Sequence, residues 1–317
     1  MRLGRICKYD AAGFDLVKSS GLEFMEICCN YQSEAEACSA AEKSIKENIA
    51  RTGIDVSSIG RWNHDVQENG KIVSDRADSY FKLLDTAMNV GAKTFVCGIN
   101  YDESISLYKN YVNALSFFSR LIKRAEGSGV KVSVQNCSWN NFVVSPREWE
   151  VVMGELKDLW IKFDPSHSYN RGGDYLAELS DWCNRVSLIH IKGTVHAGKN
   201  NVDDPPAGMD DIKWRSLFAI LYARKYNGDL SIEPHSATWQ GELGKKGVDF
   251  TAKFITPLLT ETSPSVGSAG VKLLYSRLSA CSLCGAKIEL KNVAMPLCSI
   301  KMLEKTITPS SSTTTAS

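Results

Sequence analysis

The chain has 317 residues, of which 43% are hydrophobic, and carries a formal net charge of +1 at pH 7. A chain of this size can bury a large core in one or two domains, and its balanced charge disfavours nucleic acid as a partner. No apolar run reaches the ~20 residues needed to span a bilayer, and no secretory signal pattern is evident. We therefore expect no membrane association, a cytoplasmic location and reduced thiols for the 10 cysteines.

Short apolar or β-branched stretches alternate with longer amphipathic stretches along most of the chain. The amphipathic stretches, such as "SYFKLLDTAMNVG", carry apolar residues at three- and four-residue spacing and end in glycine, which is typical of helices. Eight strand and helix pairs within about 260 residues match a barrel better than a doubly wound sheet of five or six strands. The sequence therefore predicts an α/β fold, a (β/α)8 TIM barrel, over residues 1–263. The predicted strands are 5–8, 24–28, 55–60, 94–98, 131–135, 161–164, 187–191 and 230–233.

Residues 264–317 differ in character from the predicted barrel. They end in "TPSSSTTTAS", which has no apolar period, and a polar segment of this kind does not build a core. Cys281, Cys284 and Cys298 lie in this region, but a structural zinc site needs four ligands and no second close pair follows them. We predict a poorly ordered tail or a small appendage.

Four polar residues end four consecutive predicted strands: Gln135, Asp164, His190 and Glu233. Adjacent strands lie about 4.8 Å apart, so these side chains can converge at the mouth of a barrel. A set of oxygen and nitrogen donors without cysteine suits Mn²⁺, Mg²⁺, Co²⁺ or Zn²⁺. A single aspartate at a strand end more often caps a turn or helix, but four residues at matching positions favour a divalent metal site.

The stretches "IKFDPSHS", "LIHIKG", "DDPPAGMDDIKW" and "LSIEPHSATWQGELGKKGVDFT" resemble the sugar phosphate isomerase/epimerase family of the xylose isomerase-like barrel superfamily. The resemblance implies that Asp164, His190 and Glu233 bind the metal. The fourth ligand of the family is usually a glutamate, and Gln135 stands there in this chain. In the ketose 3-epimerases of the superfamily two glutamates bind the metal and exchange the substrate proton. Glutamine cannot act as a base, so Gln135 is a neutral ligand, a substrate contact or neither.

Other polar residues follow the same strand ends. The resemblance implies a substrate-binding or acid/base role for His167, whereas a loop histidine often only caps the next helix. Lys192 lies two residues beyond His190 and faces the same side if the strand continues, so it could steady an enolate or phosphate, or simply be solvated. His64 and His196 receive no role. We expect Glu233, His167 and Lys192 to be the catalytic residues.

The remaining candidates are predicted to bind substrate. Asp204 lies in the long loop "NNVDDPPAGMDDIKW" and could hydrogen-bond sugar hydroxyls, although charged loops are often merely solvated. His235 could contact substrate or orient Glu233. Trp139 offers a flat apolar face to a sugar ring, or packs as an ordinary aromatic residue. Gln135 completes this group.

We therefore expect a metal-dependent isomerase or epimerase that acts on a sugar, keto-sugar or sugar phosphate through an enediolate. Elimination needs only one base, so Gln135 keeps open a dehydratase or lyase acting on a keto-sugar, keto-glycoside or keto-inositol. Two other readings are disfavoured. An apurinic endonuclease-type phosphodiesterase would need ligands for a zinc cluster, and the chain has 5 histidines. An inactive barrel would be favoured by Gln135 alone. The expected partner is a small-molecule carbohydrate, and the sequence leaves homo-oligomerisation open.

Overall fold

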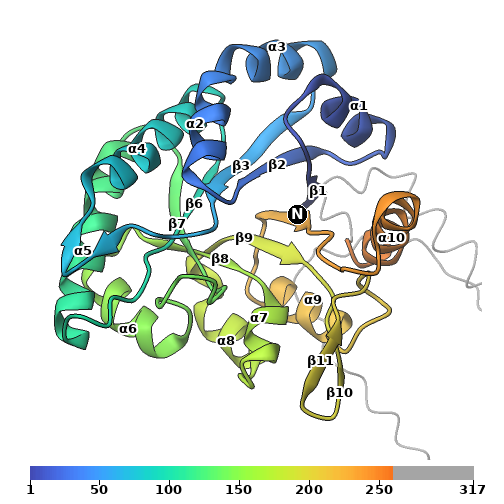
Figure 1. The fold of residues 1–317 in the computed structure, drawn as a ribbon. Helices are drawn as coiled ribbons and strands as arrows, with labels where there is room; N and C mark the ends of the chain where they lie inside the picture. The colour runs from blue at the N-terminus through green and yellow to red at the C-terminus, as the bar shows by residue number, and fades with distance from the viewer. Residues whose placement is uncertain (260–317) are drawn as a thin grey trace, which may run out of the picture. The chain divides into compact units, whose positions relative to one another are not determined.

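A computed structural model describes residues 1–259, and within them eight parallel strands close into a barrel in the order β1, β12, β9, β8, β7, β6, β3, β2. Helices connect consecutive strands and surround the ring (Figure 1). This arrangement confirms the predicted TIM barrel. The predicted boundary at residue 263, the tail and its cysteines lie outside the described residues. The barrel strands are β1 Arg2–Ile6, β2 Phe24–Cys29, β3 Asp55–Arg61, β6 Thr94–Cys97, β7 Lys131–Gln135, β8 Trp160–Phe163, β9 Val186–Ile191 and β12 Asp229–Ile232.

Several helices begin at a residue whose side chain caps their first turn. In α5, for example, the Ser106 side chain accepts a hydrogen bond from the backbone of Lys109, while Phe117, Phe118 and Leu121 form part of its buried face. None of the helices in the described residues is long and apolar enough to cross a membrane. The helices are α1 Ala11–Ser19, α2 Gln32–Ala40, α3 Glu42–Thr52, α4 Ser74–Asn89, α5 Leu107–Ala125, α6 Pro146–Glu155, α7 Pro165–Asn170, α8 Tyr175–Trp182, η1 Cys183–Arg185, α9 Trp214–Ala223, α10 Gly241–Ile255 and η2 Thr256–Leu258.

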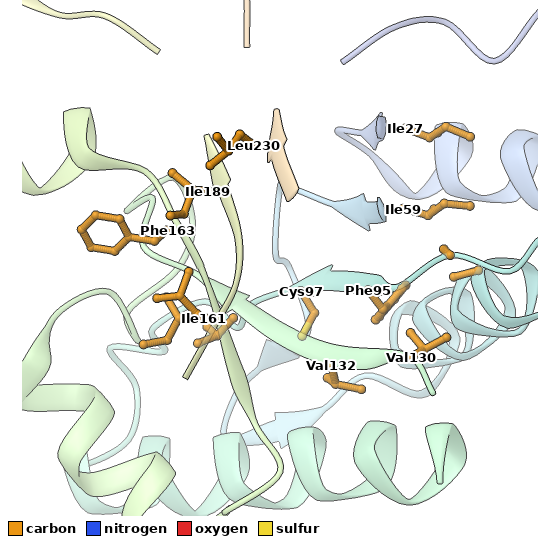
Figure 2. Packing of buried hydrophobic residues seen from close by; sticks show 14 of the residues in the cluster. Ile27, Ile59, Phe95, Cys97, Val130, Val132, Ile161, Phe163, Ile189 and Leu230 are labelled. Carbon is orange, nitrogen blue, oxygen red and sulfur yellow. The ribbon is translucent and has the colours of Figure 1, made fainter. Parts of the chain in front are cut away.

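The strands separate two sets of side chains because successive residues of a strand point to opposite faces. Figure 2 shows apolar residues of the main core, among them Ile27, Phe95 and Ile189. A second, small apolar cluster contains Trp62, Val96 and Leu188. The polar side chains near the strand ends occupy alternate positions on their strands, so they point to the same face of the barrel wall.

Two local predictions were wrong. The first strand is Arg2–Ile6 rather than 5–8, because Leu3 packs in the core and Arg2 forms a 2.6 Å ion pair with Asp229 at the start of β12. The predicted loop after the seventh barrel strand begins as part of a hairpin, β10 Val195–Ala197 with β11 Asn200–Asp203. These polar strands lack the apolar alternation that reveals a strand. A second hairpin pairs β4 Gln67–Glu68 with β5 Lys71–Ile72.

The segment between β11 and α9 is held by a partly buried carboxylate that should make stability depend on pH. Asp210 accepts hydrogen bonds from the backbone of Gly208 at 2.8 Å and from the indole of Trp214 at 3.0 Å. Burial raises the pKa of Asp210 to about 6. The folded protein therefore binds this proton more tightly than the unfolded chain, whose aspartate pKa is about 3.9.

This raised pKa stabilises the fold below about pH 4, and the contribution disappears as the pH rises through about 6. Because Asp210 is partly exposed, we expect the loss to be about 1–2 kcal/mol. Chemical denaturation of the wild type and Asp210→Asn at about pH 4.5 and about pH 7 should show the wild type losing stability relative to the variant. Parallel pH dependences in the two proteins would contradict this.

Candidate active site

Asp164 directly follows strand β8, and its two carboxylate oxygens have different surroundings. Its extended backbone, φ −128°, and Pro165 at the first helical position begin α7. Oδ1 accepts hydrogen bonds from the backbone and hydroxyl of Ser166 at 2.9 and 2.7 Å, and the amide of Asn136 holds the Asp164 backbone on both sides. Within residues 1–259, Oδ2 accepts no hydrogen bond although it is buried. One oxygen therefore caps the helix, and the other is available to a cation.

His190 lies between two carboxylates in the centre of the site. Its Nε2 is 3.0 Å from Glu26 Oε2 on β2, and its Nδ1 is 2.8 Å from Glu233 Oε2 just beyond β12. Burial alone would lower the pKa of His190, but Glu26 and Glu233 together raise it above its usual value. One ligand atom each from Asp164, His190 and Glu233 lies within 4.8 Å of the others. The three residues therefore face one common point.

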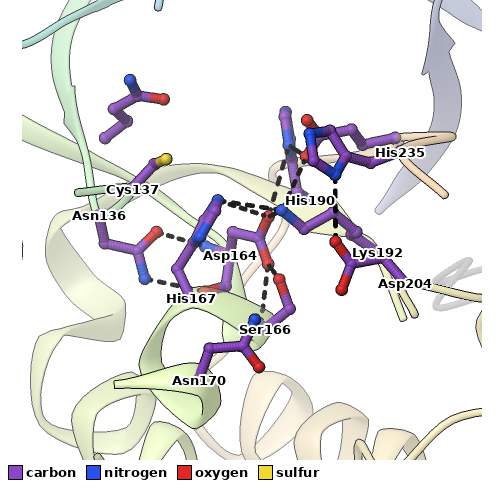
Figure 3. Close-up of polar contacts among 12 residues, drawn as sticks. Asn136, Cys137, Asp164, Ser166, His167, Asn170, His190, Lys192, Asp204 and His235 are labelled. Atoms are coloured by element: carbon purple, nitrogen blue, oxygen red, sulfur yellow. Dashed lines mark hydrogen bonds and ion pairs between the residues drawn. The ribbon is translucent and has the colours of Figure 1, made fainter. Parts of the chain in front are cut away.

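Two buried lysines share this space (Figure 3 shows Lys192 beside Asp164 and His190). Lys192 Nζ is 3.3 Å from Asp164 Oδ2 and 3.7 Å from Glu233 Oε2. Lys162 on β8 is fully buried, and its Nζ is 3.9 Å from Asp164 Oδ2 with no hydrogen-bond partner in the described part of the chain. Burial opposes ionisation of Glu233, but the charges of Lys192 and then His190 lower its pKa well below the usual value. Glu233 is therefore a carboxylate at neutral pH.

His167 lies within helix α7 rather than in the predicted loop, because Pro165 starts the helix directly after Asp164. Its Nε2 is 3.0 Å from Lys192 Nζ and 3.5 Å from Asp164 Oδ2. Burial, followed by the charge of Lys192, lowers the pKa of His167 to about 3. The imidazole is therefore neutral at pH 7, and its Nε2 lone pair accepts a hydrogen bond from the Lys192 ammonium.

Gln135, at the end of β7, is fully buried, and its amide nitrogen forms hydrogen bonds with residues of the barrel wall. Nε2 is 3.1 Å from the Trp62 carbonyl oxygen and 2.7 Å from His64 Nε2. Its Oε1 has no hydrogen-bond partner in the described residues. A buried acceptor left without a partner costs about 1–3 kcal/mol. Such an unpaired oxygen is expected where a bound ligand supplies the missing partner.

The remaining predicted residues lie further out, at the rim. Asp204 Oδ2 is 3.1 Å from His235 Nδ1, and the His235 side chain is 60% exposed. Trp139 is 43% exposed and meets the edge of the Tyr31 ring, with centroids 6.1 Å apart. The rim therefore offers an ion pair and an aromatic pair, while the titratable cluster lies deeper.

Sequence reasoning missed Glu26 and Lys162. Each is a charged residue within an apolar strand, in "FMEICC" and "WIKF", and such a residue is costly to bury without a partner. The signal was therefore present. The contact of Glu26 with His190 could not be read from it, since these residues are 164 positions apart. Lys162, in contrast, is close to Asp164 in the chain, so their contact could have been inferred.

The donor set fits a divalent cation. Asp164 Oδ2 and Gln135 Oε1 are buried acceptors without hydrogen bonds in the described chain, and carboxylate, imidazole and amide donors suit hard or borderline ions. Glu26 can accept the Nε2 proton of His190, which leaves Nδ1 toward Glu233 and Asp164, an arrangement found at metal-bound histidines. Because Nδ1 must be unprotonated to bind a metal, binding should release a proton.

The fold and this site define a barrel with a carboxylate and histidine cluster at the carboxyl ends of its strands, the end that carries the active site in such barrels. The model of the xylose isomerase-like TIM barrel family matches residues 14–254. The chain belongs to that family. Among curated proteins, no sequence matches it significantly.

Solved structures with the same fold include sugar epimerases. A 3-keto-D-glucoside 4-epimerase from E. coli is 16% identical, with a TM-score of 0.62 over 80% of this chain and 99% of its own. A D-tagatose 3-epimerase-like protein is 16% identical, with a TM-score of 0.66 over 81% and 98%. A D-allulose 3-epimerase from Methylomonas sp., in complex with D-allulose, is 14% identical, with a TM-score of 0.66 over 82% and 97%. At these identities the likeness shows the fold.

The contact between Glu26 and His190 predicts an effect on metal affinity. Removing a group that orients a metal-bound histidine typically weakens binding 10–100-fold, so Glu26→Ala should weaken divalent metal binding by about that factor. Competition against a fluorescent chelator would measure the change. Glu23→Ala is the matched control because Glu23 precedes the same strand but lies on the surface. Equal affinities in the wild type and Glu26→Ala would contradict the orienting role.

Proposed function

We propose that this chain is a metal-dependent isomerase or epimerase that acts on a sugar, keto-sugar or sugar phosphate through an enediolate. The observation that carries the proposal is the convergence of Asp164, His190 and Glu233 at the carboxyl ends of their strands. A divalent ion bound by these residues, with Gln135 as a fourth ligand, would polarise a carbonyl and its neighbouring hydroxyl.

The chain's own groups supply the proton chemistry. Glu233 is ionised and partly buried, and unlike Asp164 it does not cap a helix. It is therefore the base that removes the carbon-bound proton. The Lys192 ammonium lies beside both carboxylates and stabilises negative charge that develops on the substrate oxygen. It also donates to His167, so these two residues form a route by which a proton can be returned. Asp204, His235 and Trp139 at the rim bind the rest of the carbohydrate.

A dehydratase or lyase acting on a keto-sugar, keto-glycoside or keto-inositol is the second candidate. It is favoured by Gln135, because an amide cannot serve as the second base that epimerisation by two glutamates requires. Elimination proceeds from the same intermediate with Glu233 alone.

The test is proton NMR in deuterated water with keto-sugars, keto-glycosides, keto-inositols and their phosphates, in the presence of Mn²⁺, Mg²⁺, Co²⁺ or Zn²⁺. Deuterium at one carbon, accompanied by an epimer or isomer, would support the first candidate. Loss of water or of a glycosidic group would support the second. Neither exchange nor turnover with any metal, in a protein shown to be folded, would overturn both.

A further inference from the structure

The amide of Gln135 is held in one orientation by two acceptors. Its Nε2 approaches the Trp62 carbonyl oxygen at 3.1 Å and His64 Nε2 at 2.7 Å. A carboxamide nitrogen has two protons, and a backbone carbonyl can only accept. The nitrogen must therefore face Trp62, and its second proton is available for His64.

The orientation of His64 is fixed independently from its other side. His64 Nδ1 is 2.8 Å from the hydroxyl oxygen of Tyr80, which in turn donates to the carbonyl of Asn63 at 3.4 Å. Because the Tyr80 proton goes to Asn63, the Tyr80 oxygen accepts from His64 Nδ1–H. His64 Nε2 then carries a lone pair, as required to accept from Gln135. All three bonds of the chain point the same way, from the amide toward the backbone.

Close packing keeps this imidazole in place. A Cβ atom at Gly98 would lie 2.4 Å from His64 Cδ2 and 2.5 Å from His64 Nε2, so only glycine leaves room for the ring. The backbone of Asn100 donates to the His64 carbonyl at 2.9 Å, and Tyr80 packs edge-on against Phe117 of α5. His64 is fully buried and has little freedom to rotate.

We propose that His64 is a positioning residue that holds the Gln135 amide with its oxygen free for the metal site, and that this contact makes position 135 specific for glutamine. A glutamate there would turn an acceptor toward the Trp62 carbonyl and toward the His64 lone pair. Position 135 is therefore built for a neutral amide, and Gln135 is not simply a lost carboxylate. The ligand role of Gln135 rests on the proposed function, whereas its orientation by His64 does not.

The orientation is tested without metal or substrate, by long-range ¹H–¹⁵N NMR of the histidine side chains. The wild type should show His64 as the Nδ1–H tautomer, identified by the loss of its signals in His64→Phe. In Gln135→Glu, His64 should change to a form with a proton on Nε2, because the carboxylate needs a donor. An Nε2–H tautomer in the wild type, or an unchanged Nδ1–H tautomer in Gln135→Glu, would overturn the proposal.

The link to the metal site is tested by a double-mutant cycle read out as metal affinity. His64→Phe should weaken binding about tenfold when Gln135 is present and leave it unchanged in a Gln135→Met background. Gly98→Ala should mimic His64→Phe by displacing the ring, and His196→Phe at the rim is the matched control. Equal weakening in both backgrounds would overturn a role through Gln135. If no variant or wild type binds metal while the tautomers are as expected, the proposed function fails and the orientation of the amide stands.

Discussion

Replacing Asp164 by asparagine should abolish metal binding and catalysis and lower the free energy of unfolding by about 3–5 kcal/mol. The amide oxygen can still accept the hydrogen bonds of Ser166, so the start of α7 is kept. The other oxygen becomes an NH₂ group that faces Lys192 and Lys162, 3.3 and 3.9 Å from the present Oδ2. Two buried ammonium groups then lose their nearest counter-charge.

The two losses can be separated. Adding Lys162→Met to Asp164→Asn removes one of the uncompensated charges, so the free energy of unfolding should recover while metal binding does not. Asp174→Asn is the control, because Asp174 caps α8 at the surface and asparagine caps equally well. Metal analysis and chemical denaturation measure the two quantities. Full metal stoichiometry in Asp164→Asn would remove the central claim about this site.

Replacing Glu233 by glutamine should lower both turnover and solvent deuterium exchange 10²–10⁴-fold, the usual contribution of a general base. The wild-type carboxylate is ionised at neutral pH because Lys192 and His190 lower its pKa, whereas an amide cannot take a proton at all. The measurement must be made at saturating metal, since Glu233 is also a predicted ligand. Exchange, followed by NMR, reports proton removal independently of product release.

His235→Asn is the matched control for Glu233→Gln. His235 lies two residues away but its side chain is exposed at the rim, so this change should raise KM and leave deuterium exchange at saturating substrate within about tenfold of the wild type. If Glu233→Gln retained exchange at that level, the base would have to be reassigned, and His167 would be the next group to test.

The positions of the strand ends could be predicted because strands and helices have different patterns of apolar residues. Alternating short apolar and longer amphipathic stretches predict eight strands with helices between them, and a closed parallel barrel brings the carboxyl ends of its strands together. Asp164, His190 and Glu233 could therefore be placed at one site from "IKFDPSHS", "LIHIKG" and "LSIEPHS" alone. The aspartate and proline that follow β8 also start helix α7, although the sequence predicted a loop there.

The partners of those residues were decided only by the tertiary structure. Glu26 and His190 are 164 positions apart, and His64 and Gln135 are 71 apart. Strand position fixes which way a side chain points, but hydrogen bonds depend on where the loops and neighbouring strands bring a second group. The sequence by itself therefore determined the barrel and the place of its polar cluster. Closure of the barrel decided that His190 lies between two carboxylates and that His64 holds Gln135, because these contacts join segments that only the fold makes neighbours.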